Sequence, residues 1–166
     1  IDIKESKFIN VQLIKIRFEK MFFNNIIFEN CDLSNSNFNN CNFNKVTFIN
    51  CKLVGCNFNE TIFYDTNIKS SNCSYINFIE CNFKSITFIY NSFLSGSFNT
   101  CTFNICNIEE CKFTSVQFYH TKMKNLDFST SDISGIIVSS FDDFKGAIIN
   151  EFQSIDIVRL LGVTFK

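Results

Sequence analysis

Residues 31–63 read CDLSN SNFNN CNFNK VTFIN CKLVG CNFNE TIF when they are divided into groups of five. The centre of every complete group is apolar, and the same position stays apolar in all 28 groups from Ile3 to Val138. Eighteen of these central positions hold Phe. Because only 46% of the whole chain is apolar, an unbroken series of this length indicates a structural repeat.

A second position of each group is also restricted. The residue two places before the centre is small or medium-sized, as in Cys31, Ser36, Cys41 and Val46. The other three positions are mostly Asn, Ser, Thr, Lys and Glu, which favour water. Two inward and three outward residues in every five match neither the 3.6-residue period of a helix nor the alternation of a flat strand. We therefore expect the chain to turn a corner about every five residues.

This pattern resembles the pentapeptide repeat family, in which a small residue, a polar residue, Leu or Phe and two more polar residues recur. The resemblance implies an all-β solenoid, a right-handed quadrilateral β-helix with four groups of five in each coil. Since 28/4 is 7, it implies about seven coils. We expect the solenoid to occupy residues 1–141, and residues 142–166 to form a C-terminal capping and dimerisation segment.

The nine cysteines fall into the repeat rather than into a metal or disulfide motif. Eight occupy the small inward position, and Cys73 occupies a central one. We expect free, buried thiols that act as small hydrophobes, in a reducing cytoplasm. The only histidine, His120, faces outward, so the sequence predicts no metal site and no cofactor.

Asn91 and Gly96 depart from the usual residues at the small inward position. A buried amide must find hydrogen-bond partners, so we expect Asn91 to bond to the backbone or to Ser71, the equivalent residue one coil earlier. A ligand pocket at Asn91 and Gly96 is the alternative.

Two groups of outward residues are candidates for a partner surface. The first is an apolar series that recurs on every second coil, and the second is acidic. They are Ile9, Ile49 and Ile89, and Glu109, Glu110 and Asp127.

The register ends near Phe141, and a helical pattern follows. Asn150 is a plausible N-cap, and Gly162 is a plausible C-terminal stop. An apolar stripe at a spacing of three consists of Phe152, Ile155, Val158 and Leu161, and Ile157 and Leu160 widen it. The segment resembles the terminal helix of pentapeptide repeat proteins of the quinolone-resistance type, which implies a homodimer through this stripe. A short extended tail is expected at Val163 to Phe165.

The sequence favours a non-enzymatic protein-interaction or structural scaffold. It has no glycine-rich phosphate loop and no paired carboxylates in a predicted cleft. The family resemblance also implies an alternative, in which the rod imitates DNA and binds DNA gyrase or topoisomerase IV, giving inhibition or quinolone protection. That mechanism needs a strongly negative surface, and a net charge of −1 argues against it.

The absence of a basic stripe argues against direct nucleic-acid binding, and no apolar run is long enough for a membrane span. The bias toward Phe, Asn, Ile and Lys is typical of AT-rich bacterial genomes.

Overall fold

A corner falls at nearly every fifth residue of the chain. Twenty-two non-glycine residues, from Glu5 to Asn125, have φ between 48° and 67°, and the number of each is a multiple of five. Gly55 and Gly135 take the same conformation in the same register. Asn is the commonest corner residue, because its short polar side chain tolerates the left-handed region better than most. The predicted corner every five residues is confirmed.

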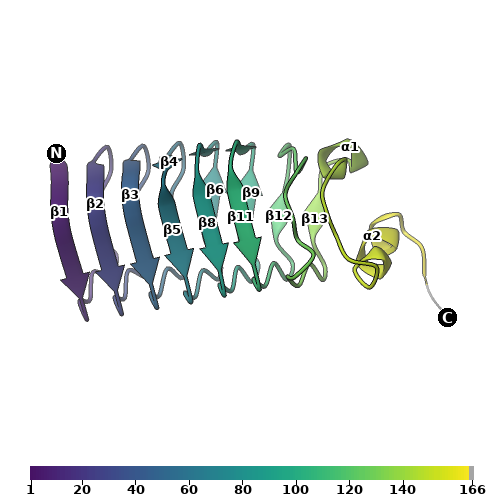
Figure 1. Ribbon diagram of the computed structural model, residues 1–166, viewed down its shortest axis with the longest axis horizontal. Coiled ribbons are helices and arrows are strands. Elements are labelled where there is room, and N and C mark those ends of the chain that lie inside the picture. Colours follow the sequence, from purple (N-terminus) through teal and green to yellow (C-terminus); the bar gives the residue numbers. More distant parts are fainter. Residues whose placement is uncertain (165–166) are drawn as a thin grey trace.

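The corners fold the chain into a parallel β-solenoid of about 7 turns, which Figure 1 shows as a row of stacked coils. The computed structural model describes residues 1–164, so Phe165 of the predicted tail and Lys166 of the C-terminal segment lie outside the described residues. Equivalent residues on successive coils pair in parallel register, as Ile3 with Phe23 and Phe23 with Phe43. We number the coils from 1 (residues 1–20) to 7 (residues 121–140), and the four sides of each coil by successive groups of five.

The strands occupy mainly the first, second and fourth sides. Three long strands, β1 (Asp2–Ile9), β2 (Phe22–Glu29) and β3 (Asn42–Ile49), run through the corner between the first two sides. Beyond β3 each coil has separate strands on these sides, so the nine-stranded sheet divides into two branches. The first branch contains β4 (Ile62–Tyr64), β7 (Asn82–Phe83) and β10 (Thr102–Phe103), and the second contains β5 (Thr66–Lys69), β8 (Ile86–Ile89) and β11 (Cys106–Glu109).

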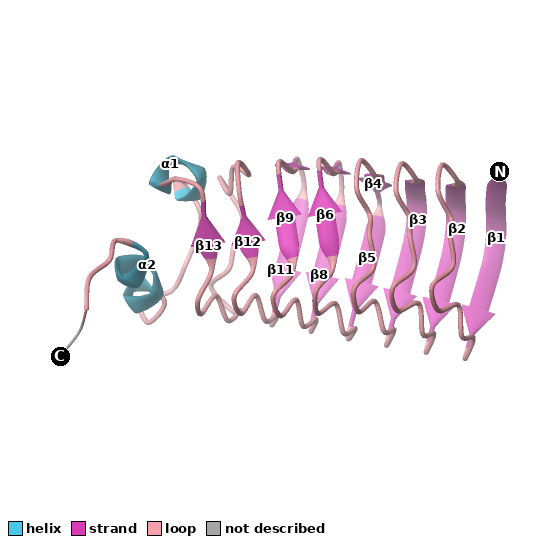
Figure 2. Ribbon diagram, turned by 180° about the vertical axis from the view of Figure 1, so that it is seen from behind, coloured by secondary structure: helices cyan, strands magenta, loops and turns pink. Residues whose placement is uncertain are grey.

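The fourth side carries a separate four-stranded sheet, which faces the reader in Figure 2. Its strands are β6 (Asn77–Ile79), β9 (Ser97–Asn99), β12 (Gln117–Phe118) and β13 (Ile137–Val138). The third side is held by single parallel bridges, such as Gln12 with Asp32 and Asp32 with Lys52. The coils are therefore joined by backbone hydrogen bonds on all four sides.

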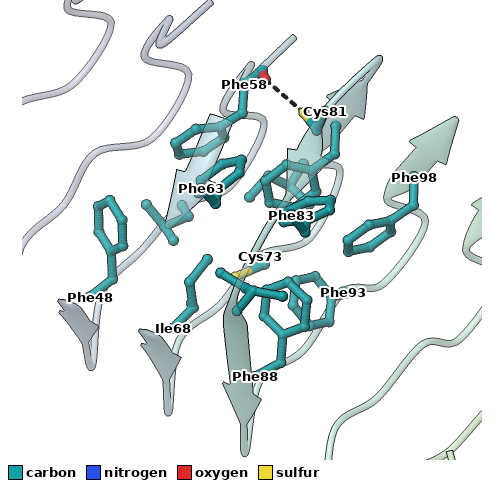
Figure 3. Packing of buried hydrophobic residues seen from close by; sticks show 14 of the residues in the cluster. Phe48, Phe58, Phe63, Ile68, Cys73, Cys81, Phe83, Phe88, Phe93 and Phe98 are labelled. Carbon is teal, nitrogen blue, oxygen red and sulfur yellow. Dashed lines mark hydrogen bonds between the residues drawn. The ribbon is translucent and has the colours of Figure 1, made fainter. Parts of the chain in front are cut away.

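The interior is built from columns of stacked aromatic rings. Phe38 and Phe58 lie with their ring centroids 4.8 Å apart and their planes 7° apart, and Phe23 and Phe43 repeat this geometry at 4.8 Å and 6°. Figure 3 shows rings from neighbouring sides meeting in the middle of the solenoid. Phe63 and Phe78, for example, form an edge-to-face pair at 5.8 Å. These offset and edge contacts are the arrangements that aromatic rings prefer.

The C-terminal segment covers the last coil. A short helix that the sequence did not predict, α1 (Phe141–Phe144), is followed by a stretch that still pairs with coil 7. The register there is shifted by one position, because Ile148 pairs with Asp127 and not with Phe128. The extra residue explains why the sequence register ends at Phe141 although stacking continues.

The predicted terminal helix is present as α2 (Ser154–Leu160). The Asn150 side chain accepts a hydrogen bond from the Gln153 backbone at 3.1 Å, and the Gln153 side chain accepts one from the Asn150 backbone at 2.8 Å. This reciprocal pair has the form of a capping box, but it closes the turn before the helix. The N-cap of α2 is Gln153, so the expected cap at Asn150 lies one turn too early. A turn fills residues 151–153 before α2 begins, so the helix is shorter than the stripe predicted. Within residues 1–164, no helix has the length and apolar character needed to cross a membrane.

Candidate interaction surfaces

The small inward residues join neighbouring coils through their side chains. Thr61 Oγ1 donates to the Phe38 carbonyl at 2.8 Å, and Cys56 Sγ lies 3.0 Å from the Leu33 carbonyl. In both cases the acceptor lies on the preceding coil, 23 residues earlier in the sequence. It is the backbone carbonyl of a central residue of the repeat. Figure 3 shows the corresponding bond from Cys81 to the Phe58 carbonyl, at 2.9 Å. The repeat places these residues inward, but the sequence did not reveal this shared hydrogen bond.

Asn91 follows the same rule with an amide. Its Nδ2 donates to the Ile68 carbonyl at 2.7 Å, and its Oδ1 accepts from the Ser71 backbone at 2.9 Å. The expected backbone partners are therefore confirmed. A Cβ added at Gly96 would lie 3.1 Å from the Phe93 carbonyl oxygen and 3.2 Å from Ile76, so the space there is filled by the protein itself.

All nine cysteines are free thiols, and eight of them are buried, as the repeat predicts. Burial raises the pKa of Cys41 and Cys51 to about 11 and that of Cys56 to about 12. A thiol with such a pKa is not a nucleophile near neutral pH. Within the described residues, no group of three or more His, Cys, Asp or Glu side chains is arranged to hold a metal ion.

The second side carries the predicted isoleucine series. Parallel pairing places Ile9, Ile49 and Ile89 in one column with charged residues between them, and we call this the Ile9 column. It reads Ile9, Glu29, Ile49, Lys69, Ile89, Glu109 from coil 1 to coil 6. In Figure 1 this side faces the reader, and the column lies near the tips of β1, β2, β3, β5, β8 and β11.

The exposure of the isoleucines is uneven. Ile9 is 47% exposed, whereas Ile49 and Ile89 are half-buried. The expectation of three exposed isoleucines is therefore correct for Ile9 and too strong for the other two. Residues on neighbouring coils lie only about 4.8 Å apart, so the side chains above and below cover part of each inner isoleucine.

The three acidic candidates lie at the C-terminal end of the same side. Glu109 and Glu110 are exposed on coil 6, and Asp127 is exposed on coil 7. The Ser129 side chain and backbone hydrogen bond to Asp127 and hold the pKa of its carboxyl below the ordinary value. The fold thus brings these carboxylates onto consecutive coils, and no basic residue is ion-paired with them among residues 1–164.

The apolar stripe of the C-terminal segment is divided between two surfaces. Ile157 and Leu160 pack against the core. Phe152, Ile155 and Leu161 are 78%, 46% and 58% exposed. Val158, the fourth predicted stripe residue, is half-buried.

A polar cluster fastens α1 to coil 7. Ser139 Oγ donates to Asp143, and Lys122 Nζ lies 2.9 Å from the other oxygen of that buried carboxylate. The hydrogen bond from Ser139, followed by the contact with Lys122, holds the pKa of Asp143 below its ordinary value. His120 Nδ1 is 3.5 Å from Ser139 Oγ. In a catalytic triad the carboxylate orients the histidine, whereas here it binds the serine directly. The cluster therefore has the geometry of a structural clamp.

A shallow hollow of about 500 Å³ follows the corner between the second and third sides. Corner amides line it, and Asn50 Nδ2 donates to Asn30 Oδ1 at 2.7 Å. Two of these corner amides thus bond to each other across neighbouring coils. The hollow contains no pair of carboxylates converging on one point.

Comparison with known proteins identifies the repeat. Residues 23–72 match the family model described as pentapeptide repeats (9 copies). No curated protein matches the chain.

Several solved structures have a similar course of the chain. A structure of full-length QnrB1, a plasmid-mediated fluoroquinolone resistance protein, is 16% identical, with 95% of this chain and 100% of that chain covered and a TM-score of 0.46. Rfr23, a pentapeptide repeat protein from the cyanobacterium Cyanothece 51142, is 10% identical over 87% of this chain and 91% of that chain, with a TM-score of 0.41. HetL, a pentapeptide repeat protein involved in heterocyst differentiation regulation in Nostoc sp. strain PCC 7120, is 10% identical over 89% and 86%, with a TM-score of 0.34.

Proposed function

We propose that this chain, whose residues 23–72 match the pentapeptide repeat family, is a non-enzymatic scaffold that binds another protein through the second side of the solenoid. The observation that carries the proposal is the Ile9 column, which ends at the exposed Glu109, together with the exposed carboxylates of Glu110 and Asp127 on the same side. The aliphatic residues offer apolar contact area, and the carboxylates offer orientation toward a basic partner surface. We place the protein in the cytoplasm of a bacterium.

The acidic end of this side provides the test. Purified protein with Glu109→Lys and Glu110→Lys is compared with wild type in chemical crosslinking and affinity capture followed by mass spectrometry. Glu60→Lys with Glu80→Lys is the matched control, because it makes the same charge change at another exposed corner. We expect a partner that the first variant loses and the control retains. Equal retention by both variants would contradict the proposal.

DNA mimicry toward DNA gyrase or topoisomerase IV is the alternative function. The exposed carboxylates on coils 6 and 7 are the feature that favours it, while the overall charge of −1 opposes it. Purified gyrase is assayed for supercoiling with increasing amounts of the protein, with and without a fluoroquinolone. Inhibition or drug protection that Glu109→Lys with Glu110→Lys abolishes would establish this alternative. Unchanged supercoiling at about a hundredfold excess would reject it.

We also propose that the protein forms a homodimer through Phe152, Ile155, Val158 and Leu161. Three of these side chains are exposed although they are apolar, which is typical of a surface that a partner covers. Sedimentation equilibrium of wild type should give twice the monomer mass of 19.3 kDa, and Phe152→Asp with Leu161→Asp should give the monomer mass. Glu151→Gln, an exposed change beside the stripe, should leave the dimer intact. A monomeric wild type would refute the dimer.

A further inference from the structure

The Ile9 column has a symmetric pattern that the proposed scaffold function does not require. Centred on Ile49, it reads isoleucine, Glu29, isoleucine, Lys69, isoleucine over coils 1 to 5. The apolar positions are the same in both directions, and the charges at equal distances from the centre have opposite signs. A column with this property is complementary to a reversed copy of itself.

From this pattern we propose that the second side of the solenoid docks, antiparallel and face to face, onto the same side of a second copy of this chain. The two-fold axis passes through Ile49, lies in the plane of the face and runs perpendicular to the long axis of the solenoid. Rotation about this axis places each column of one copy opposite the same column of the second copy, with the order of the coils reversed. Ile49 then meets Ile49 of the second copy, and Ile9 meets Ile89. Glu29 meets Lys69 at two equivalent places. Such a contact is isologous, as in most homodimers.

Charge selects the position of the axis. Centring on Glu29 or on Lys69 would oppose like charges at the axis itself, and centring on Lys69 would also oppose Glu29 and Glu109. Centring on Ile89 pairs Lys69 with Glu109 but places Ile49 opposite the polar Ser129. The Ile49 centre alone pairs all three isoleucines with isoleucines and pairs the opposite charges. Like charges directly opposite each other across an interface would be destabilising.

The charged side chains of the column remain available for ion pairs with a second copy. Lys69 forms no ion pair within residues 1–164. Glu29 has one ion pair, with Lys7 at 2.7 Å, and its side chain remains 34% exposed. A carboxylate can accept from two cations at once, so Glu29 can keep Lys7 and gain Lys69 of the second copy.

The rest of the face allows the approach. Thr47 meets its own copy at the axis, two residues before Ile49, and Ile27 meets Asn67. Lys45 would face its own copy at the outer corner, where its exposed side chain can extend into water. The overlap ends at coil 5, so the cap formed by α1 and α2 lies two coils beyond the contact, as Figure 1 shows. One side of a five-coil solenoid is a small interface, which predicts a weak and salt-sensitive dimer.

The test uses the full chain with Phe152→Asp and Leu161→Asp, so that the separate C-terminal contact does not contribute. Sedimentation velocity is measured up to about 500 μM at low and at high salt. Glu29→Lys gives a face with two cations, and Lys69→Glu gives a face with two anions. We expect each to weaken self-association by about tenfold or more, in line with the coupling of close charge pairs across interfaces. An equimolar mixture of the two variants should associate again, because every cross-pair is then of opposite sign.

The mixture also controls for folding, since a misfolded variant would not associate with the other. A matched control, Glu60→Lys, changes the same type of charge on another side and should leave self-association unchanged. Independently, Ile49→Cys should form an intermolecular disulfide under mild oxidation, whereas Asn59→Cys on the fourth side should not. A concentration-independent monomer, or a mixture no more associated than its components, would overturn the proposal.

The proposed self-docking rests on the proposed role of the second side as an interaction surface. The experiments can nevertheless refute either proposal without refuting the other. If the chain does not self-associate while affinity capture still yields a partner that depends on Glu109 and Glu110, only the self-docking is refuted. If self-association follows the charge pattern and no other partner is captured, the self-docking stands and the scaffold proposal fails.

Discussion

At the scale of single residues, the fold depends on polar atoms that are buried but satisfied. Asn91 illustrates this, because its amide supplies the partner of the Ser71 N–H and of the Ile68 carbonyl. Asn91→Leu removes both partners while keeping the volume similar. We expect it to lower the free energy of unfolding by about 2–4 kcal/mol, since an unsatisfied buried group costs about 1–3 kcal/mol. Urea denaturation measures the change.

Asn91→Ser is the control for this prediction. A serine hydroxyl already fulfils the same double role at Ser36, where it donates to the Leu13 carbonyl and accepts from the Ile16 N–H of the preceding coil. We expect the serine variant to lose less stability than the leucine variant. A leucine variant as stable as wild type would show that these hydrogen bonds contribute nothing.

The corner residues make a second prediction possible. Tyr75 has a φ of +58°, and its side chain is 57% exposed. The left-handed region costs a bulky residue more than it costs Asn, so Tyr75→Asn should raise the free energy of unfolding by about 0.5–1 kcal/mol. Tyr119→Asn, at a position without positive φ, should change it by less than about 0.5 kcal/mol in thermal or urea denaturation. Equal effects at the two sites would contradict the argument.

The buried thiols make a third prediction. Because burial raises the pKa of Cys41 and Cys51 to about 11, a thiol reagent such as Ellman's reagent should react very slowly with the native protein at pH 8. All nine thiols should react after denaturation. Rapid reaction of several thiols in the native state would indicate that the coils open readily.

At the scale of elements, the clamp between α1 and coil 7 should depend on pH. The pKa of Asp143 is lower in the folded protein than in the unfolded chain, so its ionised form stabilises the fold. This stabilisation is complete above the unfolded value of about 3.9 and is lost as the pH falls through the lower, folded value. Asp143→Asn should lower the melting temperature at pH 7, and the difference between wild type and variant should be smaller at pH 3.

Asp142→Asn provides the control for the clamp. Asp142 is the exposed neighbour of Asp143, and it takes no part in the contacts with Ser139 and Lys122. Its removal should leave the pH dependence of melting close to that of wild type. The same pH dependence in the Asp143 variant as in wild type would show that the clamp does not stabilise α1.

At the scale of the whole molecule, the solenoid is a one-dimensional stack in which each coil contacts only its neighbours. Coil 1 is covered from one direction, so its inward residues Ile3 and Phe8 are half-buried, whereas Phe58 and Phe63 in the middle are fully buried. Hydrogen exchange should therefore be fastest in coil 1 and slowest in coils 3 to 5, because local opening is easiest where fewer contacts are lost.

The exchange experiment also tests the cap. Coil 7 lies beneath α1 and the paired stretch around Ile148, so its amides should exchange more slowly than those of coil 1. Uniform exchange along the chain would mean that the solenoid opens as one cooperative unit, contrary to the stacked-coil picture. Asn150→Ala, which removes half of the capping box, should speed exchange in α2 with little effect on coil 4.

The five-residue period by itself determined the corners, the inward positions and the burial of the cysteines, and the family resemblance added the solenoid. The period also required hydrogen-bond partners for Asn91 without identifying the Ile68 carbonyl. A local repeat can do this because each group meets its equivalents on the neighbouring coils, so one register fixes every contact. Only the tertiary structure decided the branching of the sheet after β3, the helix α1 and the shift of register beyond Phe141. It also decided the division of the C-terminal stripe and the half-burial of Ile49 and Ile89. These features depend on how side chains on neighbouring coils cover one another, and no single group of five residues records that.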